Sequence, residues 1–64
     1  MRVEIGHLHI GDEIVLPGDL CGTVTEFVTA GFGAEVRTTM GTLWAKTLDE
    51  TVIRTRKGAR RSVR

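Results

Sequence analysis

Glycine and other turn residues recur so often along this 64-residue chain that no stretch favours a long helix. Eight glycines, together with the sequence Pro17-Gly18-Asp19, divide the chain into short pieces. Between these breaks lie runs of β-branched residues, of which Gly22 to Thr29 is the densest. Such runs, bounded by turn residues, are typical of short strands. The sequence therefore predicts an all-β fold in one domain, with helix limited to a single turn.

Apolar alternation places the first strands. Val3 to Ile5 is expected to form a short leading strand, and Ile14 to Leu16 a first core strand after a turn at Gly11-Asp12. We expect Asp12 to stabilise that turn through local backbone hydrogen bonds. In the long run that follows, the apolar parity changes between Val24 and Phe27. A bulge or bend near Thr25-Glu26 would place both side chains inside.

A hairpin at Gly31-Phe32-Gly33 is expected to lead into a strand from Ala34 to Met40, whose Val36, Thr38 and Met40 share one face. The segment 42–46 also alternates, so that one of its faces must be core. After it, Leu48-Asp49-Glu50 is expected to form a single helical turn. The final strand is 51–56, where two adjacent apolar residues compete for the interior, Val52 and Ile53.

This arrangement resembles the SH3-like small barrel, with five short strands, a bent second strand, tight hairpins and one turn before the last strand. The opening Ile10 to Val15, followed by Gly22-Thr23-Val24, is similar to KOW-type barrels. The resemblance implies a five-stranded barrel over 1–56 with a basic, flexible tail over 57–64, and partners such as RNA, DNA or ribosomal components. An OB-fold is the main alternative. The whole chain also resembles short proteins of actinobacteria and their phages.

Positive charge is concentrated at the C-terminus. Residues 1–53 carry three basic and eight acidic side chains, a net charge of −5, whereas 54–64 carry six basic side chains and no acidic one. Arginine forks match phosphate geometry, so this segment is a candidate nucleic-acid-binding site. The alternative is a solubilising end with no partner. The candidate residues are Arg54, Arg56, Lys57, Arg60, Arg61 and Arg64.

Two aromatic residues are candidate partner contacts, together with Lys46 and Arg37. Trp44 lies on the outer face if Leu43 points inward, and an exposed indole could stack on a base or fill a pocket on a protein. Packing in the core or at the barrel rim is the favoured interpretation, because so small a protein has few large apolar side chains. Phe32, between two glycines, either contacts a partner or folds back over the barrel as a lid.

No catalytic, metal or cofactor site is expected. His7 and His9 lack a third ligand, and the single cysteine, Cys21, is expected to be a semi-buried structural residue. The chain shows no apolar stretch long enough to span a membrane and no signal-peptide pattern, so we expect a cytoplasmic protein.

Two functional hypotheses follow. The first is a non-enzymatic module that binds nucleic acid with low specificity through the Arg-rich segment. The second is a protein-interaction or self-assembly module, such as a host-factor or phage accessory protein, that uses an aromatic patch on an acidic barrel. An enzyme is the least favoured reading, since the sequence holds no nucleophile with a base beside it.

Overall fold

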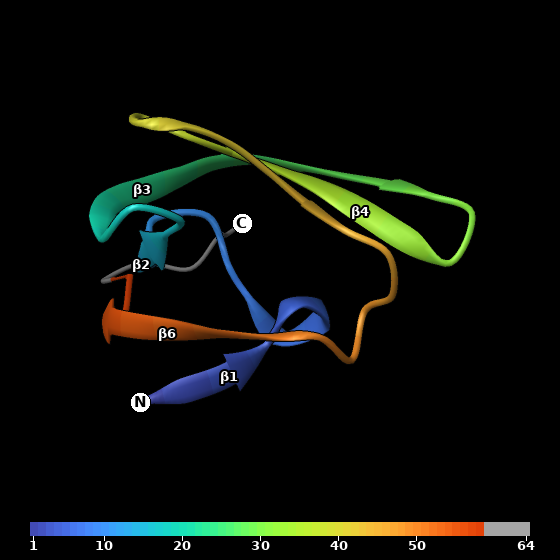
Figure 1. The fold of residues 1–64 in the computed structure, drawn as a ribbon, viewed down its shortest axis with the longest axis horizontal. Helices are drawn as coiled ribbons and strands as arrows, with labels where there is room; N and C mark the ends of the chain where they lie inside the picture. The colour runs from blue at the N-terminus through green and yellow to red at the C-terminus, as the bar shows by residue number, and fades with distance from the viewer. Residues whose placement is uncertain (59–64) are drawn as a thin grey trace.

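The computed structural model describes residues 1–58, which form six strands and one short 3-10 helix (Figure 1). The elements are β1 (Arg2–Glu4), η1 (Ile5–His7), β2 (Glu13–Leu16), β3 (Leu20–Ala30), β4 (Gly33–Thr38), β5 (Gly41–Ala45) and β6 (Thr51–Arg56). The predicted all-β class is confirmed. Within the described residues no helix is long and apolar enough to cross a membrane.

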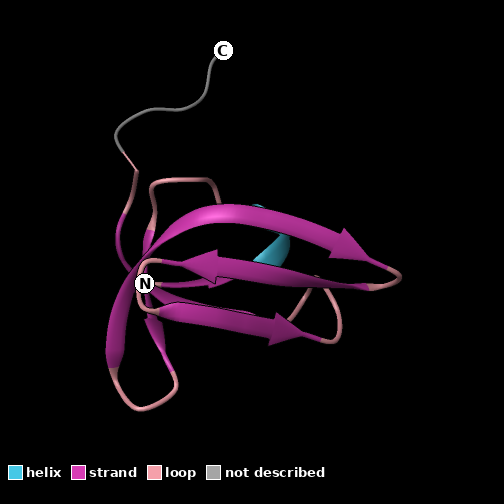
Figure 2. Cartoon of the chain, turned by 90° about the horizontal axis from the view of Figure 1, so that it is seen from above, coloured by secondary structure: helices cyan, strands magenta, loops and turns pink. Residues whose placement is uncertain are grey.

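The strands form one antiparallel sheet in the order β1-β6-β2-β3-β4-β5. The sheet is open, because its edge strands β1 and β5 are not paired with each other. It has six strands rather than the expected five, since Arg2–Glu4 pairs with β6 as an additional strand. Figure 1 shows β3, β4 and β5 lying across from β1 and β6. Figure 2 shows the long strands of the β3–β5 layer side by side.

The predicted bulge in β3 is confirmed. Val24 is opposite Thr38 and Glu26 is opposite Arg37, so Thr25 is the extra residue on the bulged strand. Because Thr25 is an extra residue, the side chains of Val24 and Phe27 both face the interior. Val24 is fully buried, and Phe27 is partly buried and packs against the core. The first part of β3 pairs with β2 and the rest with β4, so the bulge lies where β3 passes from one layer to the other.

The predicted turns are present, but β4 ends earlier than expected. Gly31 and Phe32 form the two-residue connection between β3 and β4, with Gly31 in the left-handed region at φ 62°. The expected strand from Ala34 to Met40 stops at Thr38. The Thr38 hydroxyl accepts the Met40 N–H at 3.1 Å and donates to the Gly41 carbonyl at 2.7 Å. These contacts stabilise a turn, and they leave Met40 exposed rather than on the predicted face.

The short helix lies at the other end of the chain from its predicted place. Leu48 to Glu50 belong to a hydrogen-bonded turn, in which the Glu50 N–H donates to the Thr47 carbonyl. The 3-10 helix is instead η1, and it packs on that same turn. The Ile5 N–H donates to the Glu50 carbonyl at 2.7 Å and the Gly6 N–H to the Leu48 carbonyl at 2.9 Å. The predicted leading strand accordingly ends one residue earlier, at Glu4.

The core lies between the two layers. Fully buried aliphatic side chains each contribute roughly 1.5–3 kcal/mol to folding. Of the two residues that compete on β6, Val52 packs against the core and Ile53 is 41% exposed. Ile10 is also exposed, because it belongs to the turn before β2. The buried core consists of Ile5, Leu8, Ile14, Leu16, Val24, Ala34, Val36 and Ala45.

Candidate binding surfaces

The C-terminal basic segment begins inside the sheet. Arg54 and Arg56 belong to β6, and Lys57 follows it. The remaining candidate residues, Arg60, Arg61 and Arg64, lie outside the described residues. The expected tail, 57–64, is therefore described only at Lys57 and Gly58.

Arg54 differs from the other basic residues because its charge is paired inside the protein. Its side chain is only 16% exposed, and Nη1 lies 3.5 Å from Oδ2 of Asp12. The Arg54 N–H also donates to the Met1 carbonyl at 2.7 Å, which ties β6 to the start of the chain. Arg54 thus balances a buried carboxylate. In this position its guanidinium does not face solvent, where a phosphate would bind.

Asp12 is the only charged side chain among the described residues that is fully buried, at 0% exposure. Its Oδ2 accepts the His9 N–H at 3.0 Å, which confirms the predicted role in its own turn. Its Oδ1 accepts the Gly58 N–H at 2.7 Å, a contact that spans 46 residues. We call the set Asp12, Arg54 and Gly58 the carboxylate clasp. Through it, one buried charge joins the turn before β2 to the segment after β6.

Glycine is required at position 58 because the chain approaches the turn before β2 so closely. A Cβ there would lie 2.9 Å from the Gly11 carbonyl carbon and 3.1 Å from the Ile10 oxygen. These are backbone atoms, which have little freedom to move aside. β6 ends at Arg56, as the expected domain boundary has it, but Gly58 still contacts the body.

The clasp shifts the titration of its carboxyl group. Burial raises the pKa of Asp12, but the hydrogen bonds from Gly58 and His9, and then the charge of Arg54, lower it by more. The pKa of Asp12 in the folded protein is therefore below its usual value of 3.8. The carboxylate is charged throughout the neutral range, as an ion pair with Arg54 requires.

Acid should therefore remove the stability that the clasp provides. The unfolded chain binds a proton at Asp12 at a higher pH than the folded chain does, so the contribution is complete above 3.8 and is lost as pH falls through the lower, folded pKa. We expect the difference in unfolding free energy between the natural chain and Asp12→Asn to shrink as the pH falls below 3.8. Urea titrations at each pH measure this difference. A difference that does not shrink at any acid pH at which the natural chain is folded would contradict the assignment.

The structure adds a basic residue that sequence reasoning missed. Arg2 lies opposite Ile53 in the β1–β6 pair, and its Nη1 donates to the Thr51 hydroxyl at 3.0 Å. No local pattern could have indicated this, because the pairing joins opposite ends of the described chain. Arg2, Arg56 and Lys57 are exposed, and none forms an ion pair with another residue of 1–58. We call these three residues the basic edge.

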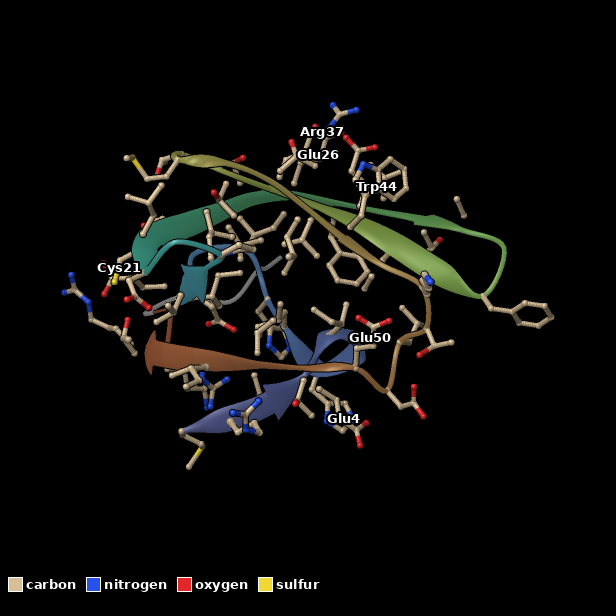
Figure 3. All side chains as sticks on the ribbon, in the orientation of Figure 1. Glu4, Cys21, Glu26, Arg37, Trp44 and Glu50 are labelled. Atoms are coloured by element: carbon tan, nitrogen blue, oxygen red, sulfur yellow. The ribbon has the colours of Figure 1, made fainter. Side chains whose placement is uncertain are left out.

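Trp44 is exposed, so the favoured interpretation of it as a core residue is wrong. Its side chain is 67% exposed, whereas its neighbour Ala45 is 4% exposed and faces the core. Ala45 lies opposite the buried Ala34 of β4. Trp44 lies opposite Glu35 on the outer face of the sheet. Figure 3 shows it pointing away from the core on the same side as Arg37 and Glu26.

Arg37 forms the centre of an ion-pair network on that outer face. Its Nε lies 2.8 Å from the Glu35 carboxylate and its Nη1 lies 2.9 Å from that of Glu26. The hydrogen bond that Arg37 donates to Glu35, followed by the charges of Glu26 and Glu35, raises the pKa of Arg37. Glu26 lies on the neighbouring strand β3 and Glu35 on β4 itself, opposite Trp44, so Arg37 is held on the same outer face as Trp44.

The other two candidate contact residues lie in turns. Phe32 lies at the tip of the β3–β4 hairpin and is 89% exposed, so it does not fold back over the core as a lid. Lys46 follows β5 with an exposed side chain, and its N–H donates to the Glu50 carboxylate at 3.0 Å. The four candidates therefore surround β4 and β5, on the side of the sheet remote from the basic edge.

Within residues 1–58, the two histidines and the cysteine do not form a metal site. His7 belongs to η1 and His9 to the loop after it, so they do not share a strand face. Residues 1–58 contain no group of three side chains that could hold a metal ion. Cys21 is exposed on β3, which corrects the expectation of a semi-buried position.

No protein-family model, curated protein or solved structure matches this chain. The functional argument therefore rests on the chemistry of two surfaces. One is the basic edge with the segment that continues from it, and the other is the aromatic surface around β5.

Proposed function

We propose that the protein is a small, non-enzymatic binding module of the SH3-like kind, whose basic C-terminal segment binds nucleic acid through its phosphates with low sequence specificity. The bent β3, the tight turns at 31–32 and 39–40, and the turn at 47–50 before β6 support the SH3-like interpretation. Because small barrels host many activities, the function is argued from the charges and not from the fold.

The observation that carries the proposal is the division of charge made by the carboxylate clasp. Asp12 and Arg54 neutralise each other inside the protein, and Gly58 fixes the base of the segment against the body. Arg56 and Lys57 remain exposed beside the clasp. With the three arginines that follow in sequence, five basic side chains are available, and no acidic residue lies between them.

Low specificity follows from where the charges lie. Phosphate contacts position a protein on nucleic acid, whereas base edges carry the sequence information. The acidic side chains of the body, including the Glu26 and Glu35 carboxylates, disfavour close approach of phosphates elsewhere on the sheet. Within residues 1–58, the exposed Arg2, Arg56 and Lys57 form no ion pair, so no carboxylate partner opposes phosphate contact at the basic edge.

Salt dependence tests the proposal. Each phosphate contact with a duplex contributes about −0.9 to the slope of log affinity against log salt, so five contacts give a slope of about −4.5. Affinity for a short mixed-sequence duplex should then fall by about 500-fold between about 50 mM and about 200 mM salt. Fluorescence anisotropy on a labelled duplex measures the slope. Absence of binding at about 50 mM salt would reject the proposal.

A triple variant identifies the residues. Replacing Arg60, Arg61 and Arg64 with serine leaves two basic side chains in the segment, and we expect the slope to fall to about −2. Lys46→Ser is the matched control, because it removes an exposed charge far from the segment in the sheet order. The control should bind as the natural chain does. If the triple variant has the same slope of log affinity against log salt as the natural chain, the phosphate-binding site lies elsewhere.

The exposure of Trp44 supports a second function, contact with a protein partner. Large side chains buried at the centre of an interface contribute most to binding, and tryptophan is enriched among them. Trp44 and Phe32 are the most exposed aromatic side chains of the protein, at 67% and 89%. This surface lies on β5 and the adjoining turns, so the two proposed functions use separate parts of the sheet.

A further inference from the structure

The two edges of the sheet are unequal in their protection against pairing with another strand. Natural sheets protect exposed edges with short strands, charged side chains, prolines or bulges. β1 has three residues, two of which, Arg2 and Glu4, are charged, and it passes directly into η1. This edge is therefore closed to further strands by its length and its charge.

The longest internal stretch that lacks a second strand partner lies in β3. From Thr25 to Ala30, β3 pairs with β4 only. This stretch begins at the bulge and carries the charged Glu26, two of the features that protect edges. It is consequently a poor template for another strand.

β5 has none of these protections. Gly41 to Ala45 contains no charged residue and no proline, and its register with β4 is regular along its length. In an antiparallel ladder, alternate residues direct their N–H and C=O groups away from the neighbouring strand. Because β5 is the last strand of the sheet, half of its backbone groups face the open side. Such an edge favours addition of another strand.

We propose that β5 pairs antiparallel with β5 of a second copy of this chain, forming a two-fold dimer with a continuous sheet. The proposal names the partner of the Trp44 surface and rests on that second function alone. It does not depend on nucleic-acid binding.

Charge selects a second copy as the occupant. Two copies of a body with a net charge of −5 over residues 1–53 repel each other, and they approach with least repulsion where the surface is uncharged. β5 is the only edge of the described sheet without a charged residue. A partner peptide with a strong charge of either sign would find no complementary charge within β5.

The sequence of β5 is also self-complementary. In a register centred on Leu43, Thr42 lies opposite Trp44 of the other copy, and the reverse pair forms by symmetry. Aromatic and β-branched residues are favourable cross-strand pairs.

The interface is small, and its affinity should be low. A five-residue strand pair with one tryptophan at each end belongs at or below the lower limit of about 1,200 Å² for specific interfaces. We expect a dissociation constant of about 100 μM, which falls at higher salt because salt screens the repulsion between the two acidic bodies.

Analytical ultracentrifugation from about 5 μM to about 1 mM protein tests the proposal at low and high salt. We expect a monomer–dimer equilibrium at both. Trp44 is the only tryptophan, so its emission should shift to the blue as dimer forms. Amide hydrogen exchange at Thr42 and Trp44 should slow in the same concentration range. These readings use the unmodified chain, so they do not depend on the folding of a variant.

Thr42→Lys places like charges close together across the paired strands and should weaken dimerisation by at least about tenfold. Thr42 is exposed, so melting temperature should change little. Thr29→Lys is the control, because it adds the same charge to the stretch of β3 that pairs with β4 only.

A monomer up to about 1 mM would overturn the self-pairing but leave Trp44 as a surface for another protein. A dimer that ignores Thr42→Lys and leaves the Trp44 emission unchanged would overturn the contact surface as well. If only Thr29→Lys weakens the dimer, the interface lies on β3, and the pairing through β5 is rejected.

Discussion

Asp12→Asn is expected to lower the free energy of unfolding by about 3 kcal/mol, because breaking a buried ion pair leaves its partner charge uncompensated. Asparagine keeps the shape of the side chain but removes the charge that balances Arg54. The two N–H groups of His9 and Gly58 now face a group that can offer only one acceptor oxygen. For a domain of this size, whose stability is near the lower end of the usual range, this loss is a large part of the total.

Urea denaturation followed by Trp44 fluorescence and circular dichroism measures the loss. Asp19→Asn is the matched control, since Asp19 is exposed and its left-handed backbone, at φ 63°, suits asparagine. The control should change stability by less than about 0.5 kcal/mol. Equal effects from the two substitutions would mean that the buried carboxylate adds nothing beyond an ordinary turn.

Gly33→Ala is expected to cost about 3 kcal/mol, for reasons of space alone. A Cβ at this position would overlap the Ala45 carbonyl oxygen and come within 2.7 Å of that of Lys46. Both atoms belong to the backbone at the end of β5, which is fixed by its pairing with β4. Relief of the overlap requires the two strands to separate, and the buried Ala34 and Ala45 would lose their contacts.

Gly6→Ala provides the comparison for Gly33. A Cβ at Gly6 meets only Leu48 atoms at 3.4 Å, and its backbone is not in the left-handed region. The expected change is below about 1 kcal/mol, measured by thermal unfolding of both variants beside the natural chain. If Gly33→Ala melted with the control, the β4–β5 pairing would have to be looser than the structure describes.

Local signals in the sequence predicted most of the sheet. The bounds of β6, the bulge at Thr25 and the turn at Gly31-Phe32 were all predicted correctly, because each depends on residues adjacent in the chain. The features that failed depend on tertiary contacts. η1 forms where Ile5 and Gly6 meet the turn before β6, which no pattern within the first ten residues reveals. The leading strand was predicted, but its pairing with β6 was not, because that pairing joins distant parts of the chain.

The candidate sites show the same limit. Charge counting located the basic segment but treated its six residues alike, whereas the structure separates Arg54 from the exposed Arg56 and Lys57. The prediction that Trp44 packs in the core was wrong for another reason. Both faces of β5 carry apolar side chains, so alternation alone cannot decide which faces the core. The pairing with β4 decides it, because Ala45 lies opposite the buried Ala34 and Trp44 lies opposite Glu35.

The contact between Asp12 and Gly58 has a consequence for how the chain reaches its native state. β2 to β5 are joined in sequence by short turns, so their pairing closes only small loops and can form early. β1 and the other side of β2 must wait for β6, whose pairing joins residues about forty to fifty positions apart. During synthesis, therefore, the charge of Asp12 stays without its ion-pair partner until the last strand has emerged. Folding of the sheet is therefore completed by β6, and until then the half-formed sheet leaves the backbone groups that pair with β6 exposed.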